Sequence, residues 1–485
     1  SGSGVLTTRG TTTVDMAGGQ RLLALTGGKT WVNEGELTFG GDDYLYFGYS
    51  SGGTNTLTNA TGATLNLSST HATPLNRYTG TAVLNNEGTL NLTVSGSHAI
   101  DSGVAFHNSG TVNVDAGTLV IEGSGTDTGE YAVDAGATLD FRGGTRNLSA
   151  GTSVVGSGTW AVSGGTVNIN DALEVSALEL RGGTLSGAGE LIVAESFSAT
   201  GHSFLSGGGV FRTRGTSTID LGGGATLLSL TGGKTWVNEG ELTIGGDDYL
   251  YFGYTGGGTN TLTNAAGGTL NLSSTNATPL NRYTGTAVLN NEGTLNLTVS
   301  GSHAIDNGIA FHNSGTVNID AGTLNYGTSF TNSGVLSIAP SARLSIGGNF
   351  TASDQGTVRV GLANATSYGV LAATGTATLA GTLAVALDGG YQPLPGEVFD
   401  VLTYANRSGD FDVLRGESLG AQVDFEVDTT TDPGMLKVVN VTVSTVQPGT
   451  DLVPLPPALS PPPPESSGNT PTMQWAVNNT GSVAA

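Results

Sequence analysis

The chain has 485 residues, of which 79 are Gly and 11 % are charged, and it contains no Cys. Its formal net charge of −23 opposes binding to nucleic acid and to anionic membrane surfaces. The lack of Cys excludes disulfides, zinc–thiolate sites and cysteine nucleophiles. We attribute the charge to keeping an exposed rod in solution, with cation-dependent packing as the alternative. The chain begins at Ser1 without Met or a signal peptide, so we expect a processed product or a fragment.

A long internal duplication dominates the sequence. Residues 1–119 recur as 206–324 at a constant offset of 205, without insertion or deletion. The run at Thr26–Leu37 returns unchanged at Thr231–Leu242. Uninterrupted spacing of this kind indicates a unit that is stacked whole into a longer rod, as in other quasi-one-dimensional repeat proteins.

A shorter pattern, apolar-x-Asn-x-Gly-x-apolar-x-apolar, recurs inside the unit. It occurs at 31–39, 84–92, 106–114 and 330–338, and more loosely at 57–67. Its Asn residues lie 19 to 27 residues apart, which is the length of a solenoid coil with two or three short strands. The alternation predicts Leu, Val and Ile inward and Thr, Asn and Asp outward, with Asn and Gly in left-handed or tight-turn conformations at the corners. At roughly 22 residues per coil we expect about 20 coils and a rod on the order of 100 Å long.

The composition changes toward the C-terminus. From about residue 356 the chain is richer in Ala and Leu, and we expect a cap that protects the open edge of the solenoid. The following Pro-rich run predicts an extended spacer. The expected units are 1–119 (solenoid repeat, first copy), 120–205 (connecting coils), 206–324 (second copy), 325–446 (C-terminal coils and cap) and 447–485 (Pro-rich linker and disordered tail).

These coils and the segment PLPGEVFDVLTYANRSGDFDVL at 393–414 resemble the passenger regions of bacterial type V secreted proteins. That group comprises filamentous-haemagglutinin-like two-partner secretion exoproteins and autotransporter passengers. A similar turn, followed by apolar-x-x-Leu-x-Tyr and Gly-x-Phe, occurs near the end of their β-helical passengers. The resemblance covers roughly residues 1–443. It implies an all-β, single-stranded right-handed parallel β-helix, export through an outer-membrane transporter, a secreted or outer-membrane-surface location, and adhesion or biofilm roles.

One aromatic run stands out in a chain that has few aromatic residues. GGDDYLYFGY occupies 40–49 and recurs at 245–254. Its tyrosines are candidates for a stacking platform for sugar rings or a partner, and its aspartates for accepting hydroxyls or holding Ca²⁺. The simpler interpretation is a structural strand opened by an acidic turn, with Leu45 and Phe47 in the core. The candidate binding residues here are Asp42, Asp43, Tyr44, Tyr46, Tyr49, Asp247, Asp248, Tyr249, Tyr251 and Tyr254.

A second candidate is the NRYTG turn. It contributes Arg77 and Tyr78, and Arg282 and Tyr283 in the second copy, for an acidic or sugar partner. A lone Arg in a turn is more often structural. The set His98, Asp101 and His107 is too sparse for a metal site, which needs three or four convergent ligands, and we expect surface polar residues there.

These observations favour a cell-surface, adhesin-like rod that attaches to glycans, matrix or other cells and gains avidity from its duplicated unit. A filament or sheath protein that self-associates is the first alternative, and a polysaccharide-degrading β-helix enzyme is the second. No phosphate loop, nucleophile elbow or dinucleotide fingerprint occurs, so we expect no catalysis and no cofactor.

Overall fold

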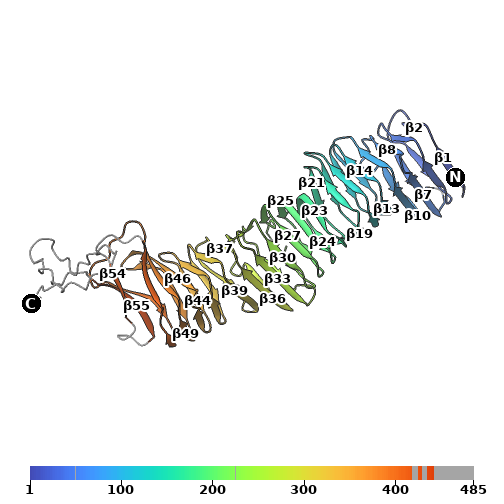
Figure 1. The fold of residues 1–485 in the computed structure, drawn as a ribbon. Helices are drawn as coiled ribbons and strands as arrows, with labels where there is room; N and C mark the ends of the chain where they lie inside the picture. Colours follow the sequence, from blue (N-terminus) through green and yellow to red (C-terminus); the bar gives the residue numbers. More distant parts are fainter. Residues whose placement is uncertain (50, 224–225, 418–423, 429–433, 442–485) are drawn as a thin grey trace, which may run out of the picture.

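The computed structural model describes residues 1–49, 51–223, 226–417, 424–428 and 434–441. Over these residues the chain is a right-handed parallel β-solenoid of about 17 turns without any helix, which Figure 1 shows as one long rod. The expected fold class is therefore confirmed. The expectation of about 20 turns is too high because several turns are long; thirty residues separate Leu250 from Leu280 on one face, for example. The linker and tail at 447–485 lie outside the described residues.

The turns contribute strands to three faces, which we call A, B and C, and most strands pair in parallel with their neighbours in the turns before and after. Face A consists of β1 (Val5–Thr8), β4 (Thr30–Asn33), β7 (Thr54–Asn59), β10 (Thr81–Asn86), β13 (Val104–Asn108), β16 (Gly125–Asp127), β19 (Thr145–Leu148), β22 (Thr166–Ile169), β24 (Gly183–Ser186), β26 (Ser203–Leu205), β29 (Leu228–Leu230), β32 (Leu250–Phe252), β35 (Leu280–Arg282), β38 (Ser302–Ile305), β41 (Thr323–Tyr326), β44 (Arg343–Ile346), β48 (Val370–Ala373) and β51 (Val398–Thr403).

Faces B and C share two long strands, β23 (Leu173–Leu180) and β25 (Leu191–Ala199), which run from one face to the other. The other strands of face B are β2 (Thr11–Val14), β5 (Glu36–Phe39), β8 (Thr64–Leu67), β11 (Thr89–Leu92), β14 (Thr111–Val114), β17 (Glu130–Val133), β20 (Ser153–Val155), β27 (Val210–Thr213), β30 (Thr235–Asn238), β33 (Thr259–Asn264), β36 (Thr286–Asn291), β39 (Ile309–Asn313), β42 (Phe330–Asn332), β45 (Phe350–Ala352), β49 (Thr376–Leu379) and β52 (Asn406–Gly409). Those of face C are β3 (Leu22–Leu25), β6 (Tyr44–Phe47), β9 (Leu75–Arg77), β12 (Ser97–Ile100), β15 (Thr118–Ile121), β18 (Thr138–Phe141), β21 (Thr159–Val162), β28 (Thr216–Ile219), β31 (Glu241–Ile244), β34 (Thr269–Leu272), β37 (Thr294–Leu297), β40 (Thr316–Ile319), β43 (Val335–Ile338), β46 (Thr357–Asn364), β50 (Thr382–Leu387) and β53 (Val413–Glu417).

The core is a column of apolar side chains that stack turn upon turn. Many strands alternate between partly exposed and buried residues, as in Thr-Leu-Asn-Leu of β8 and β11. Parallel in-register pairing then places Leu65 under Leu90 and Leu90 under Val112, all fully buried. Burial of this column at ~25 cal/mol per Å² is the main stabilising term, since the chain has no disulfide.

The Asn of the repeated pattern lies directly before a corner, with its side chain buried and not turned outward. Asn33, Asn59, Asn86 and Asn108 are the last residues of their strands and are fully or almost fully buried. Each amide donates to the side-chain oxygen of the next Asn, at 2.9, 2.8 and 2.8 Å. Non-Gly residues with left-handed φ among the described residues are only Ala17 and Ser341. The expectation of Asn in left-handed corners and outward positions is therefore wrong for this ladder.

The Gly of the same pattern is required by close approach and not by φ. Gly110 has no left-handed φ, but a Cβ there would lie 2.0 Å from the carbonyl oxygen of Gly88 in the previous turn. A Cβ on Gly88 would in turn lie 2.3 Å from Ala63 O. Successive corners are therefore stacked backbone on backbone, which only Gly permits.

The C-terminal end of the parallel stack changes to antiparallel pairing. β54 (Asp424–Asp428) pairs antiparallel with β55 (Met435–Val441), and β55 pairs antiparallel with β51. A short β47 (Ser367–Tyr368) also turns back on β46. Figure 1 places β54 and β55 at the end of the rod, where they cover its last turns. The expected C-terminal cap is present.

An ion pair replaces the Asn ladder in the connecting coils. Asp127 follows Asn108 in register and bonds to Arg146, and both side chains are fully buried. Tyr131 donates to Asp127 Oδ1 at 2.7 Å, and Arg146 Nη1 donates to Phe106 O at 2.6 Å. Burial raises the pKa of Asp127, and the charge of Arg146 opposes that shift. Every charged atom of the pair is thus hydrogen-bonded inside an apolar column.

The two copies of the repeated unit occupy the faces differently. Nine turns of the solenoid separate β1 from β26 on face A. β27, the equivalent of β1, then lies on face B, because it pairs with the first part of β25. A unit of 205 residues is therefore nine turns and one face long. Each strand of the second copy lies one face further round the chain path than its equivalent.

The buried Asn ladder should be a sensitive point for stability. Asn59→Ala leaves Asn86 Oδ1 and Thr89 O without their donor, so we expect a loss of about 1–3 kcal/mol in unfolding free energy. The control is Asn91→Ala in the partly exposed ladder to Asn66, where water can replace the amide and the change should stay within about 0.5 kcal/mol. Denaturant unfolding measures the free energy of unfolding of both variants. Equal losses would contradict a special stabilising role for the buried Asn ladder.

The buried ion pair makes a second prediction. Arg146→Met leaves Asp127 charged and unpaired in the core, and we expect destabilisation of about 3–5 kcal/mol. Arg9→Met removes an exposed pair with Glu34 and should cost about 0–1 kcal/mol. Thermal unfolding of the two variants measures both losses of stability. A loss in Arg146→Met no larger than that in Arg9→Met would contradict a stabilising role for the buried ion pair.

Candidate functional site

The first candidate surface is a group of tyrosines on face C, which we call tyrosine cluster 1. It consists of Tyr44, Tyr46, Tyr49 and Tyr78. β6 alternates as expected, so Leu45 and Phe47 are fully buried while Tyr44 and Tyr46 point outward and are partly exposed. This part of the sequence prediction is confirmed.

The four rings touch one another in a continuous surface. Tyr46 lies edge-on to Tyr44 at 5.0 Å between ring centroids and stacks with Tyr49 at 5.9 Å. Tyr78 lies 5.5 Å from Tyr49 and 5.8 Å from Tyr46. Tyr49 and Tyr78 are 47 % and 62 % exposed, so their faces remain open to a ligand. Burial and the neighbouring phenols raise the pKa of Tyr44, and its hydroxyl remains a hydrogen-bond donor at neutral pH.

A glycine holds the two turns of the cluster together. Gly48 follows β6 with φ +80, and a Cβ there would lie 1.8 Å from Thr79 O. The turn after β6 therefore lies directly on the turn after β9. This close approach places Tyr49 beside Tyr78, although 29 residues separate them.

The aspartates of the run serve the backbone. Asp43 is 2 % exposed, and its carboxylate accepts hydrogen bonds from the amides of Met16 and Arg21. Asp248 is 4 % exposed and accepts from Leu221 at 2.7 Å, and burial raises its pKa. These two residues anchor the preceding loop and do not line the tyrosine surface. Asp42 and Asp247 are more exposed and remain available beside it.

Tyrosine cluster 2 consists of Tyr249, Tyr251, Tyr254 and Tyr283 on face A. Tyr251 lies 4.9 Å from Tyr249 and 5.7 Å from Tyr254, and Tyr254 lies 5.2 Å from Tyr283. Tyr283 is 64 % exposed. The second copy therefore rebuilds the same surface from the same residues.

The surroundings of the two clusters differ. In cluster 1, His71 packs against Tyr44 at 4.2 Å, whereas Asn276 replaces it in the second copy. In cluster 2, Phe204 stacks with Tyr254 at 6.3 Å and His202 adds a further edge. The sequence did not identify these neighbours, because they come from other turns whose register cannot be read from the motif. The outward position of Phe204 in β26 was the signal available.

The arginines of the NRYTG turns are structural. Arg77 Nη1 donates to Gly80 O at 3.0 Å, and Arg282 Nη1 donates to Gly285 O at 2.9 Å. A Cβ on Gly103 would lie 1.8 Å from Arg77 Nε, so the side chain lies flat on the next turn. Arg77 thus fixes the turn that presents Tyr78.

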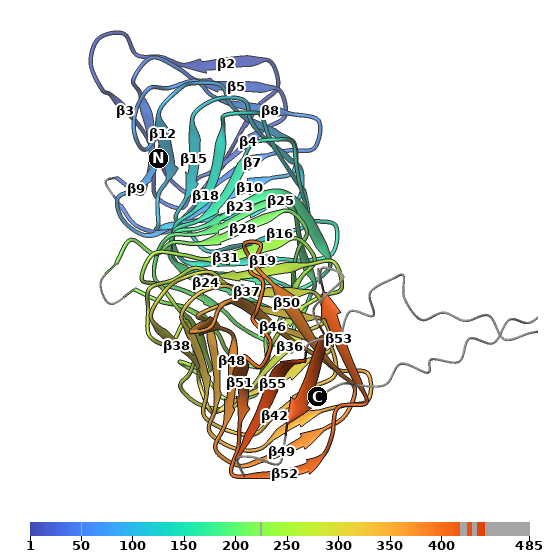
Figure 2. The ribbon, with the colours of Figure 1, turned by 90° about the vertical axis from the view of Figure 1, so that its left-hand side faces the viewer.

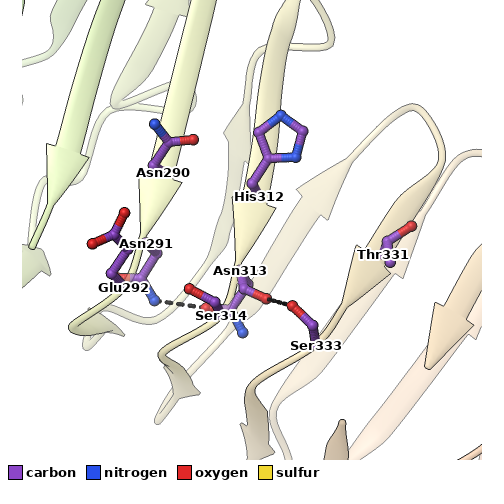
Figure 3. Close-up of a pocket in the computed structure, with 8 residues that line it drawn as sticks. All are labelled: Asn290, Asn291, Glu292, His312, Asn313, Ser314, Thr331 and Ser333. Atoms are coloured by element: carbon purple, nitrogen blue, oxygen red, sulfur yellow. Dashed lines mark hydrogen bonds between the residues drawn. The ribbon is translucent and has the colours of Figure 1, made fainter. Parts of the chain in front are cut away.

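A second type of surface feature is a shallow hollow that occurs once in each copy. One, of about 170 Å³, is lined by Asn290, Asn291, Glu292, His312, Asn313, Ser314, Thr331 and Ser333. Figure 3 shows Asn290, His312 and Thr331 on the strands beside the Asn291–Asn313 hydrogen bond. The equivalent hollow around His107 measures about 230 Å³. Burial, and then Arg146, lowers the pKa of His107, which favours the neutral imidazole. These hollows are too open and too small to enclose a ligand.

The sparse histidine set does not converge. His98 is buried on face C, with its ring nitrogens 2.9 Å from the carbonyl oxygens of His71 and Ser95. His107 belongs to β13 on face A. Across the described ranges of the chain, no group of three or more His, Cys, Asp or Glu side chains is placed to hold a metal ion. The same residues include no helix suited to crossing a membrane.

Comparison with known proteins adds no family assignment. No family model matches the chain, and no curated protein matches it significantly in sequence. The candidate site therefore depends on geometry alone.

One lysine is buried, and among the described residues no ion pair joins it to a carboxylate. Lys234 precedes β30 and is 5 % exposed, and burial lowers its pKa to about 8. The equivalent Lys29 in the first copy is partly exposed. The positive charge of Lys234 is therefore less favourable in the folded protein than in the unfolded chain.

This lysine gives the rod a pH-dependent stability. The folded-state pKa of about 8 lies below the ordinary lysine pKa of 10.5, so the cost of burying the charge is full below pH 8 and disappears as the pH rises toward 10.5. Lys234→Met should raise the unfolding free energy by about 3 kcal/mol at pH 7, with the gain shrinking above pH 8. Unfolding at several pH values measures this. Lys29→Met is the control, and an equal gain there, or one independent of pH, would refute the account.

Proposed function

We propose that the protein is an adhesin-like rod that binds neutral glycans through tyrosine clusters 1 and 2. The single observation that supports the proposal is the continuous, outward-facing tyrosine surface, which is built twice. Aromatic rings offer flat apolar faces for the C–H face of a sugar, and their hydroxyls pair with sugar hydroxyls. The core needs none of these rings, because Leu45 and Phe47 already fill it.

The electrostatics favour an uncharged ligand. The net charge of −23 repels anionic polymers, and Arg77, which precedes Tyr78 of cluster 1, is hydrogen-bonded to its own turn. A secreted or cell-surface location and export by a type V route belong to the same proposal. They are supported by the Cys-free rod fold and by the resemblance of its coils to bacterial passenger proteins.

The test uses ring removal at the most exposed positions, where folding is least affected. The variant carries Tyr49→Ala, Tyr78→Ala, Tyr254→Ala and Tyr283→Ala. We expect binding to at least one of mannan, galactomannan, xyloglucan and β-glucan by the wild type, and a loss of about tenfold or more in the variant, because each lost ring contact contributes about 0.5–1.5 kcal/mol.

The matched control changes the same four residues to Phe, which keeps the rings and removes the hydroxyls. We expect it to retain most of the binding. Heparin serves as an anionic probe and should not bind. Unchanged binding in the Ala variant, or no binding of any neutral polymer by the wild type, would rule the proposal out.

A further inference from the structure

The length of the repeated unit and the twist of the rod act together on the position of the two tyrosine clusters. The unit is nine turns and one face long, so cluster 1 lies on face C and cluster 2 on face A. In an untwisted three-faced rod this difference would turn the clusters away from each other by a third of a revolution. They would then meet different partners.

The rod is twisted, and the twist compensates for the difference. Figure 1 shows β7, β10 and β13 of the first copy along the lower edge of the rod, and their equivalents β33, β36 and β39 along the lower edge further on. Figure 2 shows β9 and β12 on the left-hand side, and β38, the equivalent of β12, on that side too. Equivalent strands therefore share one side of the rod although they belong to different faces.

The size of the twist is physically reasonable. A shift of one face in three over nine and a third turns corresponds to roughly 13° per turn, within the ~10–35° by which neighbouring strands rotate in sheets. The twist also has to oppose the winding of the chain. Each unit moves the chain forward by one face, and the sheets rotate in the opposite direction by about the same angle.

We infer that the two clusters form one bipartite surface for a single extended neutral polysaccharide that runs along one side of the rod. β6 and β9 carry cluster 1, and β32 and β35, next to β38, carry cluster 2. At ~4.8 Å per turn the clusters are separated by about 45 Å along the axis. A flexible polymer longer than this distance engages both, and the second contact becomes intramolecular.

The chemistry of the ligand is inferred from the charge of the chain, the exposure of the tyrosine rings and the alignment of the two clusters. The chain carries net charge −23, which disfavours an anionic strand, and both clusters offer open tyrosine faces, with Tyr78 and Tyr283 62 % and 64 % exposed. In cluster 2 the rings of Phe204 and His202 also contact Tyr254. The inference rests on glycan binding by the clusters and adds to it the form of the ligand.

The experiment compares two single-cluster variants with the wild type on mannan, galactomannan, xyloglucan and β-glucan, each as polymer and as tetrasaccharide. One variant is Tyr49→Ala with Tyr78→Ala, and the other is Tyr254→Ala with Tyr283→Ala. Polymer affinity should exceed tetrasaccharide affinity by about 10²–10⁴-fold in the wild type. Removing either cluster should abolish that excess while the remaining cluster still binds the tetrasaccharide.

Light scattering of wild-type rods with polymer supplies the second measurement. Clusters on one side bind one polymer and leave it dispersed, whereas clusters on opposite sides cross-link polymers into large particles. Cross-linking, or a polymer affinity that survives removal of one cluster, would overturn the bipartite surface while leaving glycan binding intact. If both variants bound tetrasaccharide and polymer with the affinity of the wild type, glycan binding by the clusters would be overturned, and the bipartite surface with it.

Discussion

In-register stacking of successive turns is the constraint on which the whole molecule depends. A strand in this rod finds its backbone partners only in the turns before and after, so its side chains lie on those of equivalent residues. Apolar side chains then form columns, such as Leu65, Leu90 and Val112. Polar side chains can be buried only if they too satisfy one another along the axis. The Asn33–Asn59–Asn86–Asn108 ladder meets this condition, since each amide has both a donor and an acceptor neighbour.

The same constraint separates the surface from the core. Alternate residues fill the interior, so outward residues can change without altering the packing. This freedom explains how Tyr44 and Tyr46 can occupy a strand whose inward residues, Leu45 and Phe47, are ordinary core residues. It also explains why fold alone decides so little about function: the rod is a scaffold, and specificity depends on which side chains gather on it.

The sequence predicted what local alternation controls. The parallel solenoid, the inward Leu45 and Phe47 and the C-terminal cap follow from strand periodicity and composition. Burial of Asn59 was missed because Asn in isolation favours turns, and only stacking on another Asn makes it stable inside. The Asp127–Arg146 pair was missed for a related reason, since its partners lie a full turn apart.

The candidate site was predicted in part for the same reason. Tyr46 and Tyr49 share one run, and their outward direction follows from period two. Their contact with Tyr78 depends on which turn lies on which, and this register is fixed by loop lengths and by the close approach at Gly48. The contribution of Phe204 depends on the stacking of β26 two turns before β32 on face A.

The position of the second copy bears on how such a rod can grow. β30 has the same residues as β4 but lies on face B, and β32 has the residues of Leu45–Phe47 in β6 but lies on face A. The faces are therefore interchangeable as hosts for a given strand, because each requires only an alternating apolar pattern. A duplicated unit need not contain a whole number of turns to be accommodated. Because the sheets twist by a small angle at each turn, a unit with an extra face returns its surface features to the same side, which a unit of whole turns of this length would not do.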